Sequence, residues 1–108
     1  MAMALISRRG MLSLAMAWRG LRVATFKADV TPPVGAPLCY GLVPVAETIV
    51  DPLEARGVVL YPALERPIVL CAVDWLGIGN ESRDRWRGAL AKAARTTPER
   101  VALHTVHP

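Results

Sequence analysis

Apolar residues predict strands at four places along the chain. These places are residues 21–30, 55–60, 68–73 and 101–106, where β-branched and other apolar side chains gather between turn-forming residues. Residues 68–73 are apolar at every position, which is typical of a strand covered on both faces of a sheet. Residues 57–61 and 67–73, separated by a short turn with prolines at its ends, are expected to pair as an antiparallel hairpin.

One amphipathic helix is predicted at residues 81–95. Apolar and basic side chains recur there on opposite faces at a spacing of three to four residues, and Asn80 or Ser82 is expected to cap its first turn. Thr97-Pro98 ends the pattern. Because the helix lies between strands 67–73 and 101–106, the three elements form a βαβ unit. The predicted fold class is α/β, with a partial mixed sheet.

The region between the first two strands has a different character. Residues 31–50 contain Pro32, Pro33 and Pro37 together with Gly35 and Gly41. Adjacent prolines remove the amide donors of a sheet ladder and keep the backbone extended. We therefore expect a long irregular connection, and connections of this length are often functional.

The first 19 residues form a separate leader. Ser7-Arg8-Arg9-Gly10 is followed by a short apolar stretch, which is the pattern of a twin-arginine export signal; a disordered basic leader is the alternative. The first interpretation predicts an exported chain, the second a cytoplasmic one. Two regions follow from this division: a leader at 1–19 and an incomplete domain at 20–108.

Charge and hydrophobicity argue against a nucleic-acid-binding surface and against a transmembrane helix. The net charge is +4, but residues 1–25 carry four arginines and no acid, so the other nine Lys and Arg balance the nine Asp and Glu. Such a body does not predict nucleic-acid binding, which needs basic residues gathered on one face. Although 53% of the residues are hydrophobic, no uninterrupted apolar run is long enough for a transmembrane helix.

Polar residues follow two of the predicted strands. Asp74 comes after strand 68–73 and His107 after strand 101–106. If these strands are parallel neighbours, both residues emerge at the same edge, where ligands bind in α/β sheets. His104 is expected to face the other way from His107, because side chains alternate along a strand. From the residues alone, a structural role for His107 outweighs a metal-binding one.

Four segments, in order, resemble the neutral/alkaline non-lysosomal ceramidase family. They are Lys27-Ala28-Asp29-Val30-Thr31-Pro32-Pro33-Val34-Gly35, similar to "DITPPVG"; Asp51-Pro52-Leu53-Glu54-Ala55-Arg56-Gly57-Val58-Val59-Leu60, similar to "DPLYARALVL"; Val69 to Gly77, similar to "VSLDLLG"; and Pro98 to Leu103 followed by His107, similar to "PE-VLL-ATHTHSGP".

The resemblance implies that the chain is the N-terminal part of a larger zinc-dependent amide hydrolase. His107 takes the position of the first histidine of the family's His-Thr-His motif, which is a ligand of the catalytic zinc. Val106 and Pro108 depart from that motif. The implied substrate is a lipid amide or another small amide, and the implied partner is the remainder of the catalytic domain.

One ligand does not make a catalytic zinc site, which needs three or more. We therefore expect the isolated chain neither to retain zinc nor to hydrolyse an amide, and we assign it no catalytic residue. Asp74 is a candidate for orienting a ligand histidine, with a purely structural strand-end role as the alternative. Asp51 and Arg56 are candidates for shaping the site, and Arg56 is expected to pair with a carboxylate in the core region. Trp75 and Trp86 are expected to be packing residues. The competing function is a non-catalytic α/β interaction or remnant domain.

Overall fold

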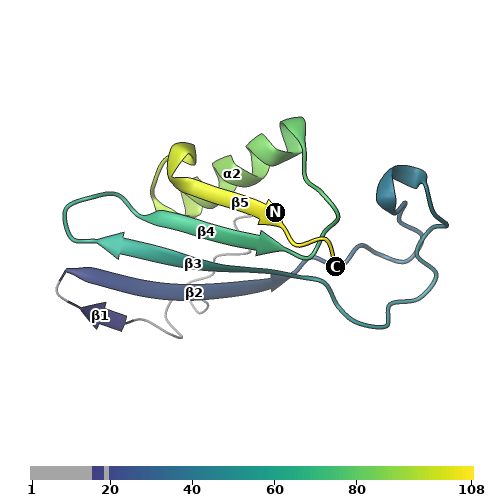
Figure 1. The fold of residues 1–108 in the computed structure, drawn as a ribbon, viewed down its shortest axis with the longest axis horizontal. Helices are drawn as coiled ribbons and strands as arrows, with labels where there is room; N and C mark the ends of the chain where they lie inside the picture. Colours follow the sequence, from purple (N-terminus) through teal and green to yellow (C-terminus); the bar gives the residue numbers. More distant parts are fainter. Residues whose placement is uncertain (1–15, 19) are drawn as a thin grey trace.

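Five strands form one mixed sheet in a computed structural model that describes residues 16–18 and 20–108 (Figure 1). Across the sheet the strands follow their order in the sequence. Neighbours from β1 to β4 are antiparallel, and β4 and β5 are parallel. The strands are β1 (Met16–Trp18), β2 (Leu21–Asp29), β3 (Glu54–Pro62), β4 (Ile68–Val73) and β5 (Val101–Thr105).

The helix α2 (Asn80–Ala94) connects β4 to β5 and packs against both strands. A short 3-10 helix, η3 (Pro98–Arg100), leads into β5. The predicted βαβ unit, hairpin and α/β class are thus confirmed. The predicted caps are wrong: Gly79 is the N-cap and no side chain bonds there, because Asn80 adopts a left-handed φ of 51° at the start of the helix.

The core lies between α2 and one face of the sheet. Every second residue of β2, β3, β4 and β5 points toward the helix side, because side chains alternate across a sheet. The buried residues of this face and of α2 form one cluster: Phe26, Ala55, Val59, Val69, Cys71, Val73, Leu90, Ala91, Ala94, Val101 and Leu103.

A glycine makes room for the one phenylalanine in this core. Gly57 is the cross-strand partner of Phe26. A Cβ at position 57 would overlap the Phe26 ring and lie 2.6 Å from the Leu70 carbonyl oxygen. The ring therefore fills the space that a larger residue at position 57 would need.

The opposite face of the sheet, here called the open face, has no helix over it among the described residues. Leu70, in the middle of β4, keeps 44% of its surface exposed. The expectation that residues 68–73 are covered on both faces is therefore wrong for the described part of the chain. The single crossover helix of one βαβ unit can cover only one side.

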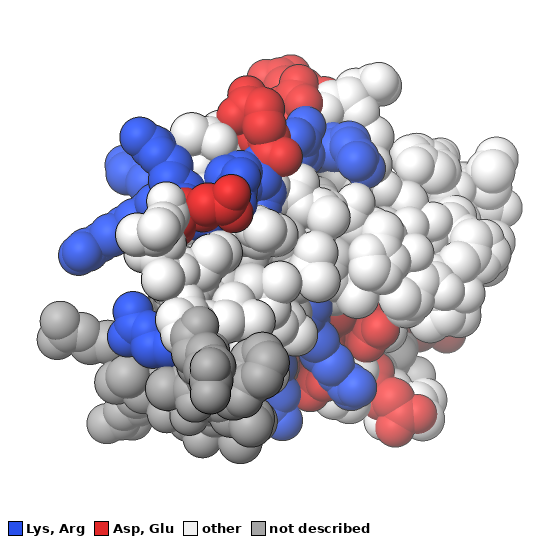
Figure 2. Space-filling model, turned by 60° about the vertical axis from the view of Figure 1, so that its left-hand side comes forward, with Lys and Arg blue, Asp and Glu red and all other residues white. Residues whose placement is uncertain are grey.

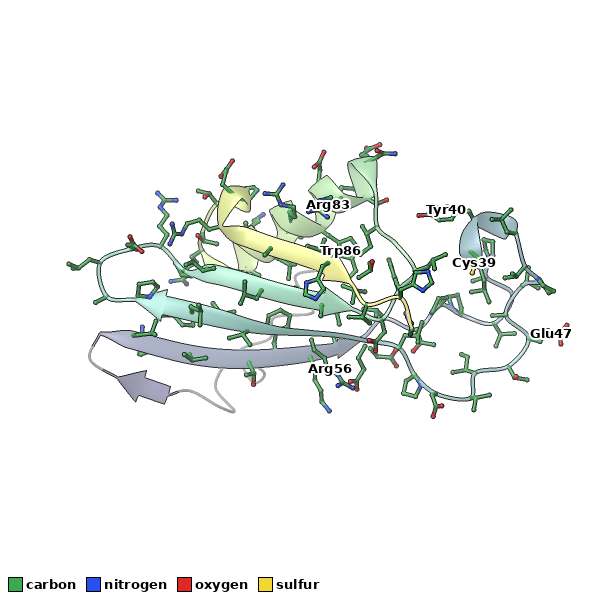
Figure 3. The ribbon with its side chains drawn as sticks, viewed as in Figure 1. Cys39, Tyr40, Glu47, Arg56, Arg83 and Trp86 are labelled. Carbon is green, nitrogen blue, oxygen red and sulfur yellow. The ribbon has the colours of Figure 1, made fainter. Side chains whose placement is uncertain are left out.

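Residues 30–53 form an irregular arm that extends beyond the end of the sheet (Figure 1). It holds the 3-10 turn η2 (Cys39–Gly41) and an isolated bridge between Leu38 and Val43. Tyr40 points back toward the loop that precedes α2 (Figure 3), where a Cβ on Gly77 would lie 3.1 Å from its hydroxyl oxygen. The predicted irregular connection is confirmed.

Both cysteines are free, with Cys39 exposed in the arm and Cys71 buried in β4. The twin-arginine-like residues 7–10 lie outside the described residues, whereas Met16–Trp18, from the end of the predicted leader, form β1. In the described part of the chain, no helix has the length and apolar character needed to cross a membrane. Basic and acidic side chains are interspersed on the face shown in Figure 2.

Candidate functional site

The first family-like segment ends β2 in a tight polar turn. The Asp29 carboxylate accepts hydrogen bonds from the Thr31 backbone N–H at 2.8 Å and from the Thr31 hydroxyl. Because both donors stabilise the charged form, they lower the pKa of Asp29 below its ordinary value. The Thr31 hydroxyl oxygen in turn accepts the Leu53 N–H at 2.9 Å, and the Val30 N–H donates to the Leu53 carbonyl at 2.9 Å. The first and second segments are therefore joined.

The second and third segments meet through Glu54 and Asp74. The Asp74 N–H donates to the Glu54 carbonyl at 2.9 Å. In the opposite direction, the Glu54 N–H donates to Oδ2 of Asp74 at 3.0 Å. The Asp74 carboxylate, directly after β4, thus holds Glu54, the first residue of β3. Both residues are half-buried.

Trp75 connects the third segment back to the first. Its indole N–H donates to the Val30 carbonyl at 3.0 Å. The ring also packs edge-on against Trp86 of α2, with ring centroids 5.6 Å apart and planes at 81°. The predicted packing role of both tryptophans is confirmed, and Trp75 adds a hydrogen bond that fixes the loop after β4.

His107 leaves the sheet beside Asp74. The Val106 N–H donates to the Val73 carbonyl at 3.0 Å, and the His107 N–H donates to the Trp75 carbonyl at 3.2 Å. The two backbone bonds flank Asp74, so the predicted emergence of Asp74 and His107 at one edge is confirmed. His107 itself is exposed and has a left-handed φ of 52°.

Part of each family-like segment therefore lies at one end of the sheet, the fourth segment contributing only His107. This site, here called the carboxyl-end cluster, contains the ends of β2, β4 and β5 and the start of β3. Hydrogen bonds link its members pairwise in a continuous chain. Its residues are Asp29, Val30, Thr31, Leu53, Glu54, Asp74, Trp75 and His107.

Arg56 lies on β3 but points away from this core. Figure 3 shows it extending from the sheet on the side opposite Trp86 and α2. It forms a 2.5 Å ion pair with Glu54, and 70% of the Arg56 side chain is exposed. The expected pairing with a carboxylate is confirmed, but its expected place in the core is wrong, because even-numbered residues of β3 face the open side.

Asp51 is exposed in the bend that precedes β3. No hydrogen bond or ion pair joins its carboxylate to any other residue in the described part of the chain. It therefore stays a candidate by its place in the sequence, without a structural contact to the carboxyl-end cluster.

The zinc site that the resemblance implies would need several His, Cys, Asp or Glu side chains close together. Within residues 16–18 and 20–108, no group of three or more His, Cys, Asp or Glu side chains is placed to hold an ion. His104 points to the open face, opposite Ala72. Asp74 already uses one carboxylate oxygen for Glu54. A catalytic zinc needs three protein ligands, so the described residues alone do not fit one, and no catalytic step is derived through it.

Sequence reasoning missed two contributors to this cluster, Thr31 and Glu54. Thr31 acts through its side-chain hydroxyl, and Glu54 through its backbone N–H and carbonyl. An Asp-x-Thr sequence before two prolines is a recognisable turn signal, and could have identified Thr31. Glu54 gives no comparable signal, because its partner Asp74 is 20 residues away.

Comparison of the chain with protein-family models, with curated proteins and with solved structures finds no match. The ceramidase resemblance therefore rests on the four segments quoted above and on their order.

Proposed function

We propose that this chain is the N-terminal part of a zinc-dependent amide hydrolase resembling neutral ceramidase, inactive as an isolated chain. What supports the proposal is a single spatial fact. Residues from each of the four resembling segments meet in one hydrogen-bonded cluster, the fourth segment contributing His107. These contacts place Asp74 and His107, the two strand-end residues singled out in the sequence, at the same end of the sheet.

The residues of the cluster divide into two roles. His107 is the exposed imidazole that would supply one zinc ligand. The other members are positioning residues: Asp74 and Trp75 fix the loop beside His107, and Thr31 joins the start of the arm to its end at Leu53. When bound in such an enzyme, zinc lowers the pKa of a coordinated water and polarises the substrate carbonyl. The remaining ligands and the acyl-binding surface belong to the remainder of the catalytic domain.

Two measurements test this proposal. The first is the nucleotide sequence after codon 108, where a continuing frame with further His and Glu codons is expected. The second uses the protein encoded by that longer frame, with zinc content measured by mass spectrometry and hydrolysis measured on ceramide and on a short fluorogenic amide. His107→Ala should remove most of the zinc and the activity, and His104→Ala should preserve both. Equal zinc content in the two variants would overturn the assignment of His107.

The isolated 108-residue chain gives a separate control. Stoichiometric zinc that survives purification, and is lost in His107→Ala alone, would contradict the expectation that the isolated chain retains no zinc. A stop codon directly after Pro108 would instead favour the second candidate, a non-catalytic interaction domain. That candidate is supported by the exposed apolar side chains of the arm, among them Leu42 at 83% and Val50 at 88% exposure.

A further inference from the structure

The open face carries an apolar patch on the half of the sheet that lies away from the carboxyl-end cluster. The cross-strand register aligns its side chains in adjacent rows, with Val23 beside Leu60 and Ile68, and Val58 beside Leu70. Leu70 is 44% exposed. The apolar patch consists of Val23, Val58, Leu60, Ile68, Leu70 and Ala102.

Charged residues occupy the other half of the open face. Lys27 is the register partner of Arg56, and Asp29 is the partner of Glu54. Arg56 in turn pairs with Ala72, which lies beside His104 of β5. An apolar occupant therefore fits only the patch itself.

The size of the patch limits what can cover it. Four strands spaced about 4.8 Å apart, over two rows of side chains, give a footprint of roughly 250 Å². A stable dimer buries about 800 Å² on each partner. A second copy of the chain would therefore be held weakly by this patch, whereas a single short segment matches its size.

Residues 1–15 are a segment of the required composition and reach. Ten of the 15 residues are Met, Ala, Leu or Ile. They precede β1, whose first residue, Met16, is the register partner of Val23 in the patch. Fifteen residues span up to about 50 Å when extended, while β2 to β5 measures only about 14 Å across. A covalently attached segment also has a high effective concentration at the patch.

We propose that residues 1–15 cover the apolar patch of the open face in the uncleaved chain. The segment enters from β1 at the edge of the sheet and places its apolar side chains over Val58 and Leu70. This assigns to the leader an intramolecular binding partner. The assignment does not depend on zinc or on the hydrolase activity.

Photo-crosslinking tests the proposal directly. The photoreactive residue p-benzoylphenylalanine replaces Leu70 in a protein whose intact mass includes residues 1–15. The matched control places it at Leu64, which is 98% exposed in the β3–β4 turn. The expected product from position 70 is a monomer crosslinked to a peptide within residues 1–15, at several times the yield from position 64. A crosslinked dimer, or equal yields at both positions, would overturn it.

A second pair of variants separates covering from misfolding. Leu12→Asp with Leu14→Asp should reduce the crosslink at position 70 about tenfold, because two charges cannot be buried on the patch. Ser7→Asp with Ser13→Asp adds the same charge at polar positions and should retain most of the crosslink. Circular dichroism confirms that all variants keep the sheet. An equal loss in both pairs would contradict apolar covering.

Discussion

Asp74 and Glu54 are joined by two hydrogen bonds that run in opposite directions, one between backbone groups and one from the Glu54 N–H to the Asp74 carboxylate. This exchange fixes the end of β4 against the start of β3. A neighbouring backbone bond attaches His107 to Trp75, the residue after Asp74, so the histidine and the carboxylate belong to one continuous set of hydrogen bonds.

Replacement of Asp74 by Ala should lower the free energy of unfolding by about 2 kcal/mol, because the Glu54 N–H loses a charged acceptor. Asp74→Asn retains an acceptor oxygen and should lose roughly half as much. Urea unfolding followed by circular dichroism measures both. Asp51→Ala is the matched control and should change stability by less than about 0.5 kcal/mol. Equal effects at positions 74 and 51 would show that the carboxylate bond is unimportant.

Thr31→Val should destabilise the fold by about 1–2 kcal/mol, because the part-buried Leu53 N–H loses its acceptor. The same change removes one of the two donors to Asp29, so the pKa of Asp29 should rise toward its ordinary value of 3.8. NMR titration of the carboxyl carbon follows this shift. Thr25→Val, on the open face of β2, should alter neither quantity; an unchanged Asp29 pKa in Thr31→Val would refute the described turn.

Much of the fold could be predicted because its elements have strong local patterns. The helix pattern at 81–95 differs from α2 by one residue at each end, and strand 68–73 is matched in full. The parallel pairing of β4 and β5 followed from the crossover length. By contrast, β1 has only three residues, too few to show a period. Its pairing depends on the turn before β2, where Gly20 has a φ of 85°.

The site could be predicted only in part, because local sequence patterns locate strand ends but not the tertiary contacts between them. Strand ends located Asp74 and His107, because parallel neighbours end at the same edge. The contacts that hold them involve residues distant in sequence, such as Val30 with Trp75. The alternation of side chains, which predicts opposite directions for His104 and His107, holds only within β5. Because β5 ends at Thr105, this alternation does not determine the direction of the His107 side chain. Tertiary pairing, rather than local propensity, decides these positions.

Gly57→Ala should destabilise the protein by about 1–3 kcal/mol, because the added methyl overlaps the Phe26 ring and the core must shift. Gly88→Ala provides a control of opposite sign. Nothing lies within 4 Å of a Cβ at that helical position, so the change should stabilise α2 by about 0.5–1 kcal/mol. Thermal unfolding of both variants checks the difference. A neutral Gly57→Ala would mean that Phe26 can move aside without cost.

Arg83 and Arg87 should protect the outer edge of β5. Arg83 donates to the Leu103 carbonyl at 3.3 Å and Arg87 to the Val101 carbonyl at 3.4 Å. Edge strands with free carbonyls recruit other chains. The double variant Arg83→Ala, Arg87→Ala should therefore self-associate at lower concentration in sedimentation velocity. Arg85→Ala, which removes only an exposed pair with Glu81, should sediment like the unmodified chain. Indistinguishable sedimentation would argue against edge protection.

Cys71 should make stability fall at alkaline pH. Burial raises the pKa of its thiol from 9.0 to about 11, because the thiolate is poorly solvated in the core. Below pH 9 the thiol is protonated in both the folded and the unfolded chain, so it has no effect on the pH dependence. Between pH 9 and 11 only the unfolded chain ionises, and stability decreases as pH rises. Above pH 11 both forms are ionised and this decrease ends.

Urea unfolding from pH 8 to 11, compared with Cys71→Ala, isolates this contribution from other groups that titrate in the same range. The variant is expected to be less stable at pH 8, because a small cavity replaces the sulfur, but to lose less stability as pH rises. A thiol reagent gives an independent reading: the exposed Cys39 should react within seconds to minutes at pH 8, and Cys71 only as fast as the protein opens. Parallel pH profiles for the two proteins, or rapid labelling of both thiols in the folded state, would contradict a buried, protonated Cys71.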